Sequence, residues 1–198
     1  MKYDVNSDWN KVYGDIVDEC CDLFCKKLGD YGPTWLYFRD ISLIDTLWIK
    51  VKRVRTLEEN GDVSAVGEGR EGEFIGIINY AAVVLMKHRF SDIFFDADHY
   101  VSNPDAAEAV SVETIMKYFR AVLDEVCELC RRKNHDYGAA WVEMDGKSIT
   151  DQVIIRVLRI KSFLKGGAPA HSEGEDAQLM DIINYSIFGL IKARGIKF

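Results

Sequence analysis

Proline is scarce in this chain, with only 3 among 198 residues. Because proline removes a backbone donor and fixes φ, its scarcity favours long helices joined by short loops. Long apolar runs are absent too, and the polar start Met1-Lys2-Tyr3-Asp4 lacks the apolar core of a signal peptide. We therefore expect a cytoplasmic, all-α protein with few or no strands and no membrane partner.

Basic residues are fewer than acidic ones: the chain has 25 Lys and Arg residues and 32 Asp and Glu residues, so its formal net charge is −7. This balance argues against a broad nucleic-acid surface but leaves room for a local cluster that holds a small phosphate. The sequence also contains no Gly-x-Gly-x-x-Gly, no Gly-Lys-Ser/Thr phosphate loop and no His-Glu-x-x-His. The common motif-bearing nucleotide and zinc sites are thereby excluded.

What the chain does contain is an internal duplication. Residues 18–61 align without a gap with residues 124–167, and 15 of the 44 positions are identical. Residues 68–89 align with residues 173–194, with 9 identities in 22 positions. Two copies are too few for a solenoid. We expect two similar helical units packed about a pseudo-two-fold axis, like a homodimer fused into one chain.

The duplication divides the chain into three parts that we expect to form one globule: a first repeat over 1–90, a connecting insertion over 91–111 and a second repeat over 112–198. Apolar periodicity predicts three helices in each repeat. The first of these is expected over about 9–28 and, in the second copy, over about 112–134.

Capping signals suggest where the later helices begin. Ser42 and Ser148 are each followed three residues later by Asp, so the second helix of each repeat is expected to open there. Ser172, with Glu175 three residues on, is expected to open the third helix of the second repeat. In the insertion, Phe94, Phe95 and Tyr100 suggest a segment that packs against the rest of the protein.

The most specific shared element is Asp-Tyr-Gly-x-x-Trp, at residues 30–35 and 136–141. The glycine is expected to adopt a backbone angle that other residues resist. Tyrosine and tryptophan could stack on a base while Lys27 or Lys133 meets a phosphate. They could equally anchor the turn, with the aspartate capping local amides. The sequence leaves both interpretations open.

Acidic residues form a second candidate site, because carboxylates that converge from two helices could hold Mg²⁺. The candidate metal ligands are Glu125, Glu128, Glu173, Asp176 and Asp181. The alternative is a solvated face with charges that complement helix N-termini. The copies differ here, because Asp181 is replaced by Gly76 in the first repeat and Glu73 by Gln178 in the second. Asp181 lies one helical turn before Asn184, so we expect the second copy to be the better candidate.

The five cysteines are Cys20, Cys21, Cys25, Cys127 and Cys130. An odd number of cysteines, in a chain with no signal peptide, argues for reduced thiols. Four of them fall at matching places in the two repeats and could meet at one zinc ion if the helices packed together. The simpler expectation is that they are small buried residues.

These motifs together resemble the nucleotide modification associated domain 1 family. The resemblance is carried in the second half by residues 133–141, by Ser148-x-x-Asp151 with Arg159, and by residues 181–185. In the first half, residues 66–69 and 73–80 look like the tandem version of the family. The resemblance covers both repeats but not the insertion.

The resemblance implies a fold similar to that of the all-α MazG-like and dimeric dUTPase-like nucleotide pyrophosphohydrolases. Those enzymes use helix carboxylates to bind Mg²⁺ and to cut nucleoside triphosphates to monophosphate and pyrophosphate. Their Glu-x-x-Asp pattern is incomplete here, because residue 178 is Gln in one copy and residue 76 is Gly in the other.

We therefore predict binding of a nucleotide or modified nucleotide, with Mg²⁺-dependent hydrolysis as the catalytic form. The predicted catalytic residues are Asp181 and Asp176. The predicted nucleotide-binding residues are Lys133, Asp136, Tyr137, Trp141, Arg159, Asn184, Asp30, Tyr31, Trp35, Arg53 and Asn79. The alternative function is a non-catalytic interaction protein that kept the fold and lost the metal site.

Overall fold

The computed structural model describes residues 5–65, 67–167 and 174–198, and the regular structure in these ranges is entirely helical. The expectation of an all-α fold is confirmed. The helices are α1 (Val5–Tyr31), η1 (Thr34–Tyr37), α2 (Asp40–Glu59), α3 (Arg70–Arg89), α4 (Ala97–Ser102), α5 (Pro104–Glu108), α6 (Val112–Tyr137), η2 (Ala140–Glu143), α7 (Gly146–Phe163) and α8 (Glu175–Ala193). None of the described helices is both long and apolar enough to cross a membrane.

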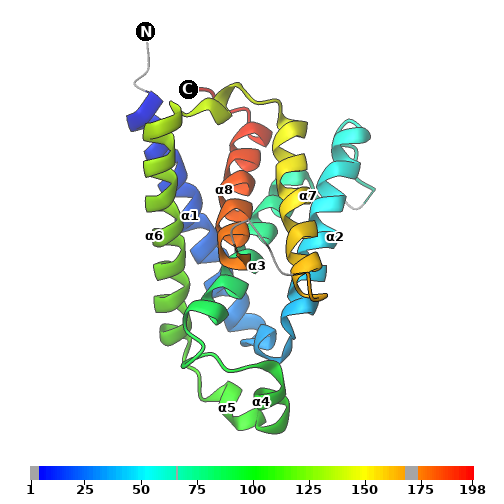
Figure 1. Cartoon of the computed structure of the whole chain (residues 1–198), viewed down its shortest axis with the longest axis vertical. Coiled ribbons are helices and arrows are strands. Elements are labelled where there is room, and N and C mark those ends of the chain that lie inside the picture. Colours follow the sequence, from blue (N-terminus) through cyan, green and yellow to red (C-terminus); the bar gives the residue numbers. More distant parts are fainter. Residues whose placement is uncertain (1–4, 66, 168–173) are drawn as a thin grey trace.

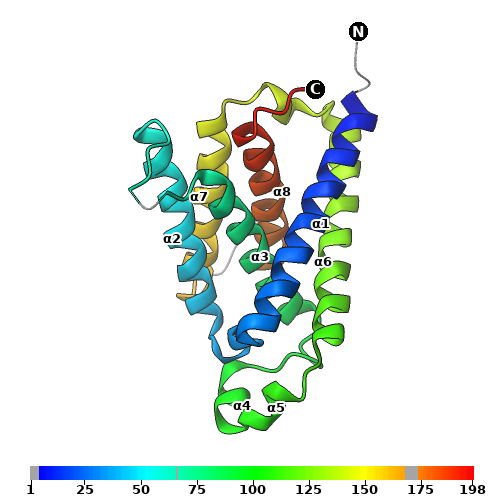
Figure 2. The ribbon, with the colours of Figure 1, turned by 180° about the vertical axis from the view of Figure 1, so that it is seen from behind.

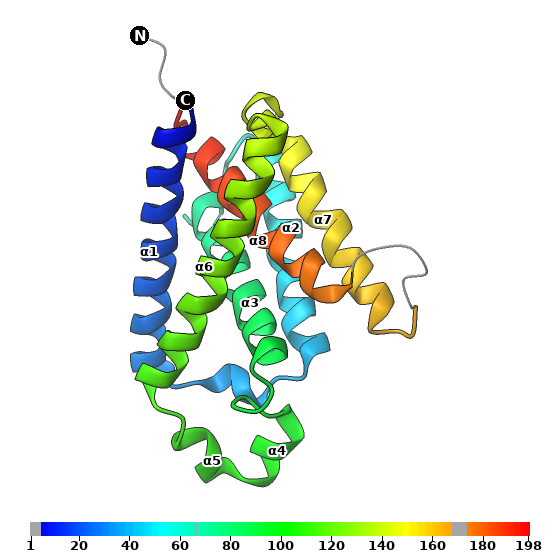
Figure 3. The ribbon, with the colours of Figure 1, turned by 60° about the vertical axis from the view of Figure 1, so that its left-hand side comes forward.

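The two repeats pack so that each helix lies against its own counterpart. Helices α3 and α8 run through the middle of the molecule, with α1 and α6 on one side of them and α2 and α7 on the other (Figures 1 and 2). The insertion contributes α4 and α5 at one end (Figure 3). This pairing of equivalent helices is the arrangement that a pseudo-two-fold axis produces.

Two arginines show the same relationship at the level of side chains. Arg89, at the end of α3, pairs with Glu125 of the second repeat at 3.2 Å. Arg194 is the aligned residue at the end of α8, and it pairs with Glu19 of the first repeat at 2.8 Å. Glu19 and Glu125 are themselves aligned in the duplication. Reciprocal contacts of this kind are what a two-fold interface requires.

The apolar faces of α3 and α8 form one core that the repeats share. Ile78 and Ile183, which are equivalent, are both fully buried in it. The helices approach closely at Gly189, where an added Cβ would lie 2.5 Å from the ring of Phe74. Burial of each repeat's apolar stripe by the other explains why the two repeats form a common body.

The predicted helix starts need correction. Helices α2 and α7 both begin two residues before Ser42 and Ser148, which therefore lie inside the helices. In α7 the cap is Asp145, whose carboxylate accepts a hydrogen bond from the backbone N–H of Lys147 at 2.9 Å. The expected start at Ser172 lies outside the described residues, and α8 is described from Glu175.

The insertion packs as predicted. Phe94 and Tyr100 are buried, and the ring of Phe94 meets the edge of Trp35 with 5.7 Å between centroids. Phe95, in contrast, is largely exposed. The insertion thus covers one side of the Asp-Tyr-Gly-x-x-Trp turn in the first repeat.

Candidate functional site

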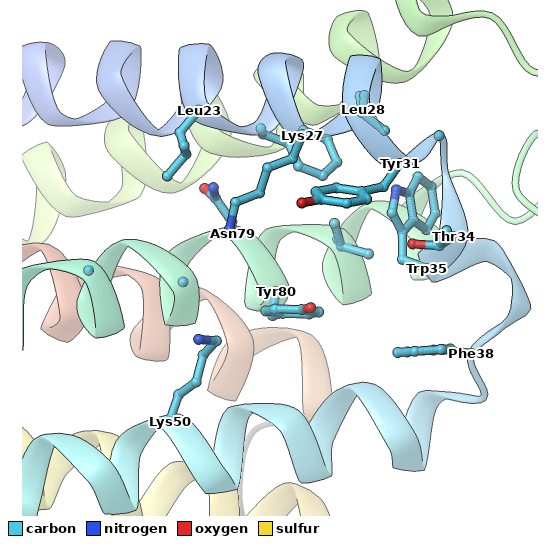
Figure 4. A pocket seen from close by; sticks show the side chains of 15 residues that line it. Leu23, Lys27, Leu28, Tyr31, Thr34, Trp35, Phe38, Lys50, Asn79 and Tyr80 are labelled. Atoms are coloured by element: carbon cyan, nitrogen blue, oxygen red, sulfur yellow. The ribbon is translucent and has the colours of Figure 1, made fainter. Parts of the chain in front are cut away.

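A cavity of about 390 Å³ opens in the first repeat between α1, η1, α2 and α3 (Figure 4). Its volume falls within the range of small-molecule sites, about 300–1,000 Å³. The wall combines aromatic rings with two lysines and a buried amide. The rings include those of Tyr31, Trp35 and Tyr80, the lysines are Lys27 and Lys50, and the amide is that of Asn79.

The Asp-Tyr-Gly-x-x-Trp turn forms one end of this first-repeat cavity. Gly32 ends α1 with a φ of +65°, the left-handed conformation predicted for it, and its N–H donates to Leu28 O at 2.9 Å. The turn gives its two aromatic residues different roles. Trp35 is only 6% exposed, whereas Tyr31 is 71% exposed at the mouth. Trp35 is therefore held by the turn and lines the inner wall of the cavity, whereas Tyr31 is open to solvent at its mouth.

Two lysines reach the cavity from opposite helices. Lys27 extends from α1, and its ammonium group has no ion pair or hydrogen bond with any described residue. Lys50 rises from α2 towards α3 and pairs with the buried Glu73 at 3.2 Å. Glu73 also accepts a hydrogen bond from Arg53 at 2.6 Å. The carboxylate of Glu73 thus pairs with both Lys50 and Arg53, and the charge of Lys27 has no carboxylate partner among the described residues.

Asn79 places a buried acceptor in the cavity wall. It is 8% exposed, and its Nδ2 donates to Cys20 O at 3.4 Å. Its Oδ1 has no partner among the described residues. In the second repeat the equivalent Asn184 accepts a hydrogen bond from the hydroxyl of Tyr13 at 2.7 Å. The residue aligned with Tyr13 is Phe119, which has no hydroxyl to offer Asn79.

Asp181, the leading predicted metal ligand, lies between two cations. Its carboxylate is 2.9 Å from Lys133 Nζ and 2.9 Å from Arg156 Nε. The guanidinium of Arg156 also lies over the ring of Tyr185, 4.4 Å from its centroid. Asp181 thereby satisfies the lysine and arginine that correspond to Lys27 and Lys50.

The other predicted metal ligands do not gather around Asp181. Asp176 and Glu125 both pair with Arg89, each at 3.2 Å, and so belong to the contact between the repeats. Glu128 is exposed and pairs with an arginine one turn along α6. Glu173 lies outside the described residues. Within the described ranges no three His, Cys, Asp or Glu side chains lie close enough to share a metal ion.

Asp176 has a further partner in His88, whose Nδ1 lies 2.9 Å from it. On its other side, His88 Nε2 lies 3.5 Å from Asp40. Hydrogen bonding to Asp40 and then to Asp176 raises the pKa of His88, against the opposing effect of its burial. The pKa of Asp40 is lowered to about 2, first by His88 and then by Lys87. This cluster connects α2, α3 and α8.

The remaining predicted residues are divided between packing and surface. Trp141 is buried and stacks flat on Phe188, with 4.2 Å between centroids and 2° between planes. Arg159 donates to Gln178 at 3.4 Å. The exposed members are Asp30, Asp136 and Tyr137, the last with 73% of its surface accessible. In the second repeat, therefore, the face of the tryptophan ring is covered by another side chain of the protein, Phe188.

Four of the five cysteines match the simpler expectation of small buried residues, and Cys25 does not. Cys25 is exposed, and the other four are buried. Burial raises the pKa of Cys130 to about 12, so this thiol remains protonated. A thiolate zinc site has no support among the described residues.

The location of the cavity was not foreseen, since the sequence favoured the second repeat. Two of the differences between the copies matter here: Gly76 stands where the second repeat has Asp181, and Val83 where it has Phe188. Both first-repeat residues line the cavity. The alignment displays these differences, but only the fold shows that both positions face the same space.

Comparison with known sequences gives a family. The sequence profile of a family described as nucleotide modification associated domain 1 matches this chain twice, over residues 27–87 and 133–193. Together the matches cover more than half of the chain, and both begin near the end of the first helix of a repeat. No curated protein and no solved structure matches the chain.

Proposed function

The chain belongs to the nucleotide modification associated domain 1 family, and from this premise we propose that it binds a nucleotide or modified nucleotide in the first-repeat cavity. The family supplies the link to nucleotide modification. The cavity supplies the chemistry that a nucleotide requires, because aromatic rings suit a base and ammonium groups suit a phosphate.

The observation that carries this proposal is the uncompensated Lys27 beside an aromatic wall. Its ammonium group has no described partner and faces a space lined by Tyr31 and Tyr80. Asn79 adds an unpaired acceptor that a donor group of the ligand can satisfy. An unpaired buried acceptor costs about 1–3 kcal/mol, so a ligand that supplies the missing donor gains affinity there.

Hydrolysis and Mg²⁺ remain predictions from the family resemblance. The carboxylates of Glu73 and Asp181 are paired with lysine side chains, and the described carboxylates form no cluster that could hold a metal. We therefore assign no catalytic step to the cavity. The same binding screen, run with Mg²⁺ and read for pyrophosphate release, tests hydrolysis directly.

The test is a titration of nucleoside mono-, di- and triphosphates, read by calorimetry and thermal shift. Lys27→Gln should weaken binding at least fivefold, because it removes the free charge from an exposed position. Its matched control is Lys133→Gln at the aligned position of the second repeat, which should leave binding unchanged. No binding by the wild-type protein would favour the alternative of a non-catalytic interaction protein.

A further inference from the structure

The second repeat fills the space that is open in the first. Its counterpart of the cavity holds the carboxylate of Asp181 between Lys133 and Arg156, 2.9 Å from each. The aligned cations of the first repeat are Lys27 and Lys50. Position 76 is glycine there, so no carboxylate stands between the two lysines at that point.

The aromatic part of the space is filled in the same way. The ring of Phe188 stacks on Trp141, at 4.2 Å and 2°, and meets Tyr185 edge-on at 5.9 Å. In the first repeat the corresponding rings are Trp35 and Tyr80, and the residue aligned with Phe188 is Val83, which lines the cavity with them. At this position, therefore, the second repeat has a ring that the first lacks, whereas at two other cavity positions the first repeat has Phe24 and Phe38 where the second has Cys130 and Met144.

Each tryptophan also has a phenylalanine in edge-on contact, and this contact is common to both repeats. Phe94 meets Trp35 at 5.7 Å and 60°, and Phe198 meets Trp141 at 5.8 Å and 77°. Both repeats thus supply an edge-on phenylalanine from a segment after the third helix. Only in the second repeat does a described ring also stack flat on the tryptophan, and that ring, Phe188, is aligned with Val83.

The position of the remaining carboxylate also separates the repeats. In the first repeat it is Glu73, which engages Lys50 and Arg53. In the second repeat the aligned residue is Gln178, and the carboxylate comes one turn later at Asp181. Because the first repeat has its carboxylate one helical turn earlier than the second, Lys27 has no partner among the described residues.

We propose that the second repeat is a self-occupied copy of the site, whose own side chains mark where the ligand binds in the first. The anion of the ligand takes the place of the Asp181 carboxylate, next to Lys27 and Lys50. Its aromatic ring takes the place of the Phe188 ring, between Trp35 and Tyr80. This inference rests on the proposed function and adds to it an orientation, one site per chain, and the residues that close the second site.

The spacing of the two marker residues limits the class of ligand. Asp181 and Phe188 are seven residues apart on α8, which is about 10 Å along a helix axis. A ligand that replaces both groups needs a ring and an anion at a comparable separation. A nucleoside carrying a 5′-phosphate chain meets this requirement, whereas a free base or inorganic phosphate can fill only one of the two places.

Two substitutions transfer the closing side chains to the first repeat. Gly76→Asp introduces the carboxylate, with Gly76→Asn as the neutral control of the same shape. A Cβ at this position would lie 2.8 Å from Cε and 2.9 Å from Nζ of Lys50, so the flexible end of that lysine must shift. Val83→Phe introduces the ring, with Val83→Ile as the control that adds bulk without a ring.

The probes are ATP, inorganic pyrophosphate and adenosine, each titrated by NMR into the wild-type protein and the four variants. Gly76→Asp should weaken ATP and pyrophosphate at least tenfold and leave adenosine unchanged. Val83→Phe should weaken ATP and adenosine at least tenfold and leave pyrophosphate unchanged. The two controls should stay within about threefold of wild type, and ATP should bind with one equivalent per chain.

The outcomes separate the inference from the function on which it rests. ATP binding that depends on Lys27 but is unaffected by Gly76→Asp and Val83→Phe would overturn the inference and leave the proposed function standing. Pyrophosphate and adenosine responses as expected, with no nucleotide bound, would support the two subsites and refute the proposed function. If Gly76→Asp or Gly76→Asn fails to fold, Lys27→Gln tests the proposed position of the ligand's anion by itself. Pyrophosphate binding that is unchanged in Lys27→Gln would then overturn that position.

Discussion

Arg194 grips Glu19 with both terminal nitrogens, each 2.8 Å from a carboxylate oxygen, and so ties the end of α8 to the middle of α1. The arginine belongs to the second repeat and the glutamate to the first. Hydrogen bonds from Arg194 lower the pKa of Glu19. Paired nitrogens on paired oxygens form a geometry that lysine cannot reproduce. This contact is therefore a specific attachment between the repeats.

Arg194→Lys should lower the free energy of unfolding by about 1 kcal/mol, since both groups are only partly buried and solvent screens the pair. Chemical denaturation measures the loss, and a double-mutant cycle with Glu19→Gln isolates the pair. The control is Arg55→Lys, which affects exposed pairs with Glu59 at 3.2 Å and with Asp151 at 3.7 Å and should change stability by less than about 0.5 kcal/mol. Equal effects at both sites would show that the attachment is not special.

Asp181 and Glu73 should prove to be structural carboxylates of the two repeats. Asp181→Asn leaves Lys133 and Arg156 without their shared anion, and we expect a loss of about 2 kcal/mol in the free energy of unfolding. Glu73→Gln should cost a similar amount, because it leaves Lys50 without its carboxylate and Arg53 with Glu68 alone. Denaturation of both variants checks this. Loss of Mg²⁺-dependent nucleotide binding in Asp181→Asn alone, with stability unchanged, would instead restore Asp181 as a metal ligand.

Trp141 should behave as a packing residue. It is 6% exposed and is stacked on Phe188, so Trp141→Ala should lower the free energy of unfolding by about 3–5 kcal/mol. The exposed Tyr137, in the same turn, provides the control, and Tyr137→Ala should cost less than about 0.5 kcal/mol. A Trp141→Ala protein of wild-type stability would contradict the packing role.

Much of the architecture was predictable because its signals are local. Apolar residues at helical spacing identified the helices, and direct identity between segments identified the repeats. The shared core followed as well, since Ile78 and Ile183 lie on stripes that neither repeat could bury alone. Even the left-handed glycine of the turn could be read from its place after a helix.

The site was less predictable because it depends on which side chains meet across helices. The sequence predicts Asp176 and Glu125 as metal ligands, yet both form salt bridges with Arg89 of the other repeat. The difference between Val83 and Phe188 is one apolar residue for another in the alignment. The difference becomes informative only in the fold, where Phe188 stacks on Trp141 and Val83 lines the same cavity as Trp35.

The last prediction concerns pH and the cluster of His88, Asp40 and Asp176. Because the pKa of His88 is raised above its usual 6.5 in the folded protein, the cluster stabilises the fold when His88 is protonated. That contribution is fully present below pH 6.5 and is lost as the pH rises through the raised pKa. Lys87 and Arg89 remain paired with the two carboxylates over this range, so part of the cluster persists.

Denaturation of the wild-type protein between pH 5.5 and 9 should therefore show a free energy of unfolding that falls above pH 6.5. His88→Gln keeps a polar side chain but cannot titrate, so its stability should lack this fall. At the acid end, Asp40 works in the opposite direction, because its pKa of about 2 means that its contribution is lost only as the pH drops below 3.8 towards 2. Wild-type and His88→Gln proteins with the same pH profile above 6.5 would show that His88 does not couple protonation to the contact between α3 and α8.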